Sequence, residues 1–110
     1  MKEVKAFLHR NRVADVLSAL KATGIDCRSC HLSVIDVKGT LEALDNRERD
    51  FSLELGEEVI TAVKLEVVCA DEDVASVVST IRREGRTGQP LAGWVYVHDI
   101  AAAWPIDREA

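Results

Sequence analysis

The sequence predicts an α+β fold made of two β-α-β units, and two patterns along the chain support this prediction. Segments that read as strands alternate or concentrate β-branched residues, and two other segments carry apolar residues at helical spacing. The 110 residues fit a single domain, 1–110, which is long enough to bury a core without disulfides or metals.

The first half of the chain predicts a strand, a helix and a strand in that order. In "MKEVKAFLHR", Val4, Ala6 and Leu8 share one face and charged residues share the other, as in a half-buried strand. "NRVADVLSALKATG" has a helical apolar face, and Gly24 is suited to end that helix. "IDCRSCHLSVIDV" follows, with β-branched residues at its end, and predicts a second strand.

The second half repeats this order after a long charged segment. "VITAVKLEVVCA" predicts a third strand, and Asp71 is a candidate N-cap for the helix "EDVASVVSTIRREG". Gly85 ends this helix and "GWVYVHDI" predicts a fourth strand. "VLSALKATG" and "VVSTIRREG" share a pattern of apolar, small and charged residues, a faint internal repeat. We therefore expect a ferredoxin-like βαβ-βαβ domain with both helices on one face of an antiparallel sheet.

The strands carry apolar residues on both sides. In the fourth strand, Trp94 and Tyr96 alternate with Val95 and Val97, so the face of the sheet away from the helices is also partly apolar. A partly apolar surface on so small a domain predicts self-association.

The overall charge and composition exclude some classes of function. A formal net charge of −5 argues against a nucleic-acid-binding protein, which needs a basic face. No apolar run approaches the roughly 18 residues that span a bilayer, and we expect a cytoplasmic protein. Three cysteines, an odd number, are expected to be reduced thiols.

The segment at about 38–58 is dense in charge, and its apolar residues never settle into a long period. Loops of this length in a compact domain are usually functional or disordered. We expect a long flexible loop here. Phe51 and several leucines among the charges favour a segment that orders when it docks a partner.

The stretch "EGRTGQP", 84–90, has two interpretations. Its glycines would let backbone N–H groups approach an anion, and Arg86 would add a bidentate donor. Alternatively, it is only a turn after the end of a helix, which the local sequence alone favours because Gly and Pro occur in any loop. No phosphate-binding P-loop motif is present.

The stretch "CRSCH" contains residue types that bind metals. If it lies in a strand, Cys27 and Cys30 point to opposite faces, and no second ligand pair elsewhere completes a zinc site. Free thiols are the favoured interpretation. No nucleophile or acid–base motif accompanies the three histidines, so no catalytic residue is assigned and no enzyme is expected.

The combined pattern resembles the PII signal-transduction proteins over nearly the whole chain. "MKEVKAFLHRNRVADVLSALKATGI" is similar to their first strand and helix, and "VKLEVVCADEDVASVVSTI" to their third strand and second helix. "RTG" before "GWVYVHDI" lies where they have a glycine-rich B-loop, and the loop after "DVKG" where they have a T-loop. The resemblance implies a compact trimer with effector clefts between subunits. Its members bind ATP or ADP, with 2-oxoglutarate joining ATP and magnesium, and their T-loops control transporters or enzymes.

The chain departs from the family pattern where the family contacts phosphates. Leu91, Ala92 and Trp94 stand where the family has a glycine, an aspartate and a phosphate-binding lysine. Pro105 and Asp107 stand where two arginines are expected, with only Arg108 nearby, and Gly39 replaces a glutamine that helps to hold magnesium. The loop has no tyrosine for uridylylation. These departures imply a divergent member with an altered nucleotide response.

The resemblance implies a non-enzymatic regulator that needs no cofactor and forms a homotrimer. A small anionic effector, such as ADP, ATP, AMP or a bicarbonate-like ion, would bind between subunits, and a membrane transporter or regulated enzyme would bind the loop. The expected effector-binding residues are Ser29, Val37, Lys38, Gly39, Arg86, Thr87, Gly88 and Gly93. The expected partner-docking residues are Arg47, Arg49, Phe51 and Ser52. The alternative is a metal- or redox-responsive trimer similar to CutA proteins, using Cys27, Cys30 and His31.

Overall fold

The computed structural model of the chain describes residues 1–24, 31–39, 49–52 and 57–107. Its regular elements are, in order, β1 (Lys2–Leu8), α1 (Val13–Ala22), β2 (His31–Gly39), β3 (Arg49–Ser52), β4 (Glu57–Cys69), α2 (Val74–Glu84) and β5 (Trp94–Asp99). Short 3₁₀ turns, Arg10–Arg12 and Asp71–Asp73, precede the two helices. The predicted order of strands and helices is confirmed, with β3 as an additional strand.

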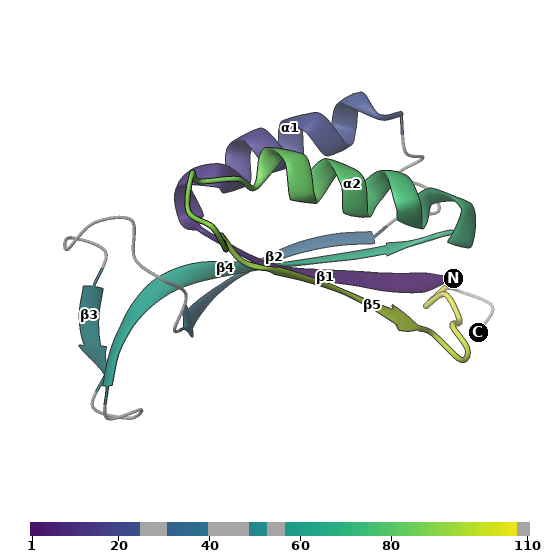
Figure 1. Ribbon diagram of the computed structural model, residues 1–110. Coiled ribbons are helices and arrows are strands. Elements are labelled where there is room, and N and C mark those ends of the chain that lie inside the picture. The colour runs from purple at the N-terminus through teal and green to yellow at the C-terminus, as the bar shows by residue number, and fades with distance from the viewer. Residues whose placement is uncertain (25–30, 40–48, 53–56, 108–110) are drawn as a thin grey trace.

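The fold has two layers, a sheet and a pair of helices. The main strands run in the order β2-β4-β1-β5, and every pairing between them is antiparallel. Figure 1 shows α1 and α2 together above one face of this sheet. This arrangement confirms the expected ferredoxin-like α+β class.

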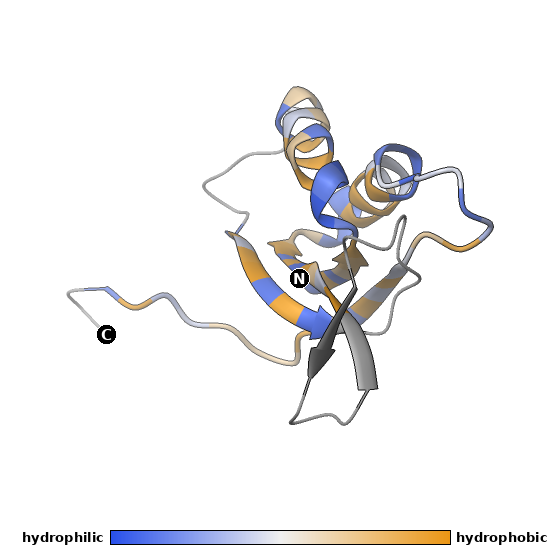
Figure 2. Cartoon of the chain, turned by 90° about the vertical axis from the view of Figure 1, so that its left-hand side faces the viewer, coloured by the Kyte–Doolittle hydropathy of each residue, from blue (hydrophilic) through white to orange (hydrophobic). Residues whose placement is uncertain are grey.

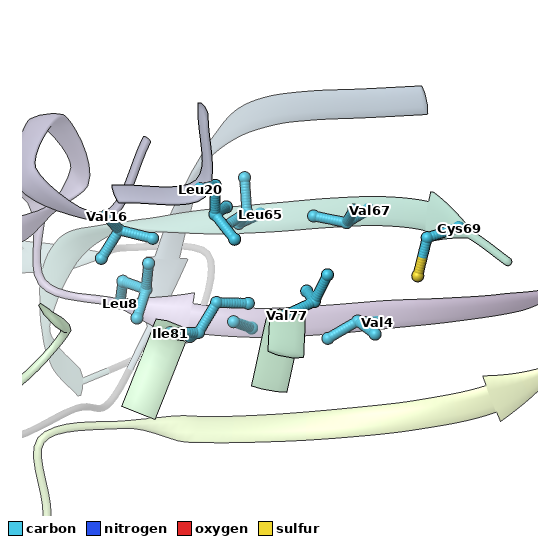
Figure 3. Packing of buried hydrophobic residues seen from close by; sticks show 10 residues of the cluster. Val4, Leu8, Val16, Leu20, Leu65, Val67, Cys69, Val77 and Ile81 are labelled. Carbon is cyan, nitrogen blue, oxygen red and sulfur yellow. The ribbon is translucent and has the colours of Figure 1, made fainter. Parts of the chain in front are cut away.

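The core lies between the helices and the sheet, where the predicted periodicities place it. Val4, Ala6 and Leu8 of β1 are buried in the core, as the period of two requires, and Figure 3 shows Val4 and Leu8 among the core side chains. The inner faces of the helices contribute four of the residues that the helical spacing identified, Val16, Leu20, Val77 and Ile81. Burying an aliphatic side chain of this size stabilises the fold by about 1.5–3 kcal/mol.

The role predicted for Asp71 is wrong. α2 begins at Val74, its N-cap position is Asp73, and neither this position nor that of the preceding 3₁₀ turn carries a side-chain cap hydrogen bond. The Asp71 carboxylate instead accepts a hydrogen bond from the Met1 ammonium at 2.6 Å. A full positive charge is a stronger partner for a carboxylate than backbone N–H groups, and sequence spacing gives no sign that the chain terminus lies so near.

The segment at 38–58 contains more regular structure than the loop expected there. β2 extends to Gly39, β4 begins at Glu57, and β3 pairs antiparallel with β4 from Arg49 opposite Ile60 to Ser52 opposite Glu57. Figure 1 shows β3 beyond the helices, at the far end of the sheet. Backbone pairing between two strands requires no regular apolar pattern in the sequence, which explains why the sequence pattern did not predict β3. Residues 40–48 and 53–56 lie outside the described part.

The face of the sheet away from the helices is mixed in character. Its β1 and β4 positions carry charged side chains in two ion pairs, Lys5 with Glu3 at 3.5 Å and Lys64 with Glu66 at 3.1 Å. Beside them an aromatic group from β1 and β5 contains Phe7, Trp94 and Tyr96, with Phe7 meeting Tyr96 edge-on at 6.1 Å. The second face is therefore charged in its middle and apolar along both edges, because Ile35 of β2 lies opposite Lys64 on this face and is 40% exposed.

Candidate functional site

The loop 85–93 links α2 to β5. Hydrogen bonds of Gly85 and of the preceding residue, Glu84, fix the position where the loop begins. The Gly85 N–H donates to the Ile81 carbonyl at 2.8 Å, which ends α2 as predicted. Arg12 donates from Nε and Nη2 to the Glu84 carbonyl at 2.9 and 2.8 Å. This forked contact supplies partners for a carbonyl that the end of the helix leaves unsatisfied, and it fixes where the loop begins.

The next residues of the loop form a turn with internal hydrogen bonds. The Thr87 hydroxyl donates to Gln89 Oε1 at 2.8 Å and accepts from the Gln89 N–H at 3.3 Å. Gly88 has φ +91°, a conformation that side-chain-bearing residues rarely adopt. Thr87 and Gly88 thus have a structural role in the turn, the interpretation that local sequence favoured.

Gly93 is required by close packing. A Cβ atom at this position would lie 2.1 Å from the Phe7 carbonyl oxygen. The loop therefore passes directly over the end of β1, and only glycine permits that approach. Four loop residues were expected to bind an effector. Thr87, Gly88 and Gly93 have structural roles in the loop, whereas Arg86 has no such role among the described residues.

A hollow of about 560 Å³ lies between this loop and α2. Leu91 and Trp94 contribute exposed apolar surface to it, each 53% exposed, while Arg82 and Arg86 contribute positive charge. Neither arginine forms an ion pair with any residue that the structure describes. Arg82 was not among the residues expected from the sequence; it lies in the last turn of α2, four residues before Arg86, and lines the same hollow.

The second group of expected effector residues lies at the end of β2. Val37, Lys38 and Gly39 pair with Ala62, Thr61 and Ile60 of β4. β2 forms one edge of the main sheet, and the loop 85–93 enters β5 at the other edge, separated by β4 and β1. Because three strand spacings of about 4.8 Å separate these edges, roughly 14 Å, one subunit does not bring the two groups together. Ser29 lies outside the described residues.

Both groups nevertheless lie at the same end of the sheet. β4 pairs with the end of β2 through Ile60–Ala62 and, one residue later, with the end of β1 through Val63. Trp94, the first residue of β5, pairs with Phe7 near that same end of β1. Their separation is therefore across the sheet and not along its strands.

The residues expected to dock a partner are only partly described. Arg49, Phe51 and Ser52 belong to β3, where backbone pairing with β4 fixes their register, and Arg47 lies outside the described residues. The pairing places these residues on a hairpin beyond the helices (Figure 1).

The metal-binding alternative receives no support. Cys27 and Cys30 lie outside the described residues, and His31 is exposed, with its Nε2 3.0 Å from the Ser33 hydroxyl. Within the described ranges no group of three His, Cys, Asp or Glu side chains is placed to hold a metal ion. Cys69 is buried in the core.

The charged groups whose pKa is shifted lie at the opposite end of the sheet from the loop. A hydrogen bond with Asp99, together with that carboxylate's charge, raises the pKa of Lys2. The hydrogen bond and charge of the N-terminal ammonium lower the pKa of Asp71. These contacts belong to the joined ends of β1, β4 and β5. None of the helices in the described ranges combines the length and apolar character needed to cross a membrane.

A family model for the nitrogen regulatory protein P-II matches residues 1–110. The chain belongs to the P-II family. The P-II 1 protein of Methanothermobacter thermautotrophicus is 30% identical over 100 residues, covering 91% of this chain and 84% of its own. The P-II 1 protein of Escherichia coli is 31% identical over 101 residues, covering 92% and 87%. P-II from Klebsiella oxytoca is also 31% identical.

Membership of the P-II family confirms the resemblance found in the sequence. P-II proteins are signalling regulators and not enzymes, they form trimers, and they bind adenine nucleotides and regulated target proteins. The family match does not favour the metal- or redox-responsive alternative.

Proposed function

We propose that this P-II protein binds a small anionic effector in clefts between the subunits of a homotrimer and controls a membrane transporter or an enzyme through segment 38–58. The observation that carries the proposal is the position of Arg86 and of Val37–Gly39 at one end of the sheet but on opposite edges. A phosphate-sized anion cannot contact both edges of one subunit. A neighbouring subunit would supply the second group, with Ser29.

The open face of the sheet supports assembly. Trp94 and Tyr96 are exposed, and their rings stack with centroids 6.4 Å apart next to Phe7. Aromatic side chains contribute strongly to protein interfaces because they bury large areas with few rotatable bonds. In a trimer these rings would pack against the neighbouring subunits, while the two Lys–Glu ion pairs would be retained.

The chemistry of the loop favours an effector with modest negative charge. Arg82 and Arg86 supply cations, but Trp94 occupies the position of the family's phosphate-binding lysine. Each lost charge-assisted hydrogen bond weakens binding by about 1.5–3 kcal/mol. We therefore expect AMP, ADP or a bicarbonate-like ion to bind in preference to ATP with magnesium.

The partner would dock on the hairpin and the residues around it. β3 projects beyond the helices at the same end of the sheet as the proposed cleft (Figure 1). Arg47, Arg49, Phe51 and Ser52 would contact the partner, and an effector bound beside Gly39 would alter the position of the hairpin.

Isothermal titration calorimetry of the purified protein with ATP, ADP, AMP, cyclic nucleotides and bicarbonate tests the effector. At least one of these ligands should release or absorb heat, and Arg86→Ala should weaken its binding about tenfold or more, the loss of one charge-assisted contact. Arg83→Ala is the matched control, because Arg83 is an exposed arginine near Arg86, in the last turn of α2, but pairs with Glu84 at 3.1 Å. A folded trimer that gives no heat with any of these ligands would contradict the effector proposal.

A further inference from the structure

The end of β2, where Val37–Gly39 are expected to meet the effector, carries two opposite charges close together. Asp36 and Lys38 are two positions apart in the strand, so their side chains leave the same face of the sheet, roughly 7 Å apart. Figure 2, which views the molecule from this end, shows hydrophilic and hydrophobic residues alternating along β2. Both charged side chains are exposed. The Asp36 carboxylate is therefore within reach of the long Lys38 side chain unless another cation occupies it.

Arg10 is the cation that occupies Asp36. Its Nη2 donates a hydrogen bond to Asp36 Oδ2, and the two side chains form an ion pair. Leu8 of β1 lies opposite Val63 of β4, and Val63 lies opposite Asp36, so Arg10 reaches over β4 to the edge strand. Lys38 forms no ion pair with any residue in the described ranges. The positive charge of Lys38 is thus left for a ligand.

The backbone that carries Arg10 is held on both sides. The Arg12 N–H donates to the His9 carbonyl at 3.0 Å, which closes the 3₁₀ turn, and the His9 side chain is buried. The Arg12 guanidinium is bonded to the Glu84 carbonyl. Arg10 therefore loses less backbone freedom on pairing than an arginine on a mobile segment would.

We propose that Arg10 neutralises Asp36 and thereby keeps the charge of Lys38 available to the anionic effector. The inference rests on the proposed function, in which the effector binds beside Val37–Gly39, and it adds the residue that sets the charge there. Without Arg10, the Asp36 carboxylate pairs with Lys38 and repels an anion. Arg10 acts through Asp36 and does not itself touch the effector.

Calorimetry with ADP at low ionic strength tests this role. Arg10→Ala should weaken ADP binding about threefold, the effect expected of one uncompensated charge roughly 7 Å away in water. The difference should disappear at about 1 M salt, where charges at this separation are screened. Arg83→Ala is the matched control, since it also removes an exposed arginine from a carboxylate, that of Glu84, and should leave ADP binding unchanged. Unchanged binding in Arg10→Ala would overturn the proposal.

Substitution of Asp36 separates this role from a direct contact. Asp36→Asn should bind ADP at least as tightly as the unsubstituted protein, because no carboxylate then lies beside Lys38. Arg10→Ala combined with Asp36→Asn should bind as tightly as Asp36→Asn alone, a rescue that the loss of a structural contact does not give. A double variant as weak as Arg10→Ala would show that Arg10 contacts the effector or holds the strand, and would overturn the proposal.

Acetylation of Lys38, followed by mass spectrometry, tests the same inference without an effector. Only the free amine reacts, and pairing with a carboxylate favours the ammonium form. The reaction at Lys38 should be about threefold slower in Arg10→Ala and should recover when Asp36→Asn is added. An unchanged rate would overturn the proposal even if ADP binds. The slower rate in a protein that binds none of the tested anions would support the charge balance on β2 and contradict the proposed effector site.

Discussion

The two ends of the sheet differ in how their charges and apolar groups are satisfied. At the end of the sheet that carries the N-terminus, here called the terminal end, the ammonium of Met1 pairs with Asp71, and Lys2 pairs with Asp99. At the loop end, Arg82 and Arg86 form no ion pair with other described residues, and Trp94 and Leu91 are exposed. The charged groups named at the terminal end are paired within one subunit. The loop end is incomplete, which is the property expected of a binding site between subunits.

The largest effect is expected at Gly93, where the loop passes over β1. Gly93→Ala would place a Cβ atom 2.1 Å from the Phe7 carbonyl oxygen, so the loop or the strand must move. We expect a loss of about 3 kcal/mol in the free energy of unfolding, at the upper end of overpacking costs, measured by urea denaturation. Gly88→Ala is the control: its Cβ meets open space, and only the strain of φ +91° remains, about 1 kcal/mol. Equal losses would show that the close approach is not what requires Gly93.

Arg12 is expected to have the next largest effect, because it holds the start of the loop. Arg12→Ala removes both donors from the Glu84 carbonyl and a contact with Asp15 at 2.9 Å. We expect a loss of about 1–2 kcal/mol in the free energy of unfolding. Arg12→Lys retains the charge but not the fork, and should recover less than half of the loss. Full recovery by lysine would mean that the charge alone is sufficient.

These two positions show how far the sequence could predict the structure. The strands, helices and core followed from periodicity, because the repeats of 2.0 and 3.6 residues decide which side chains can face the helices. Gly93 and Arg12 were beyond that reasoning, since each depends on a residue distant in sequence, Phe7 or Glu84. The pairing of β3 with β4 was missed for a related reason: backbone hydrogen bonds between strands leave no required pattern of apolar residues in the sequence.

The candidate site was predictable in part. "EGRTGQP" lies at the loop as expected, but the reasons for Thr87 and Gly88 are the internal bonds and positive φ of a turn. Arg86 therefore remains the strongest candidate for an effector contact. Val37–Gly39 lie across the sheet from Arg86 because of the strand order. Residue patterns alone do not fix this order.

A smaller, pH-dependent effect is expected at the terminal end. The pKa of Asp71 is lowered in the folded protein by the Met1 ammonium. This contact therefore stabilises the fold above the unfolded Asp pKa of about 3.9, and the stabilisation is lost as the pH falls through the lower folded value. Asp71→Asn should slightly lower the melting temperature at pH 6 and at low salt, with the difference vanishing in strong acid. A difference that persists in strong acid would mean that the ion pair is not its source.

The smallest effect on stability is expected for the arginine side chains of the hollow. Arg82→Ala should change the free energy of unfolding by less than about 0.5 kcal/mol, because the side chain is exposed and forms no ion pair with the described residues. The same change should weaken binding of the effector identified by calorimetry. A large loss of stability would mean that Arg82, like the charged groups at the terminal end, is paired within its own subunit.

Subunit complementation tests most directly whether the loop end is completed by a neighbour. Arg86→Ala and Lys38→Glu are prepared separately, each expected to bind ADP poorly, then unfolded together, refolded as mixed trimers and titrated with ADP. If Arg86 and Lys38 of one site come from different subunits, some clefts in the mixed trimers contain both original residues, and ADP binding should return. Mixed trimers that bind no better than either variant alone, while the unsubstituted protein binds ADP, would contradict the account.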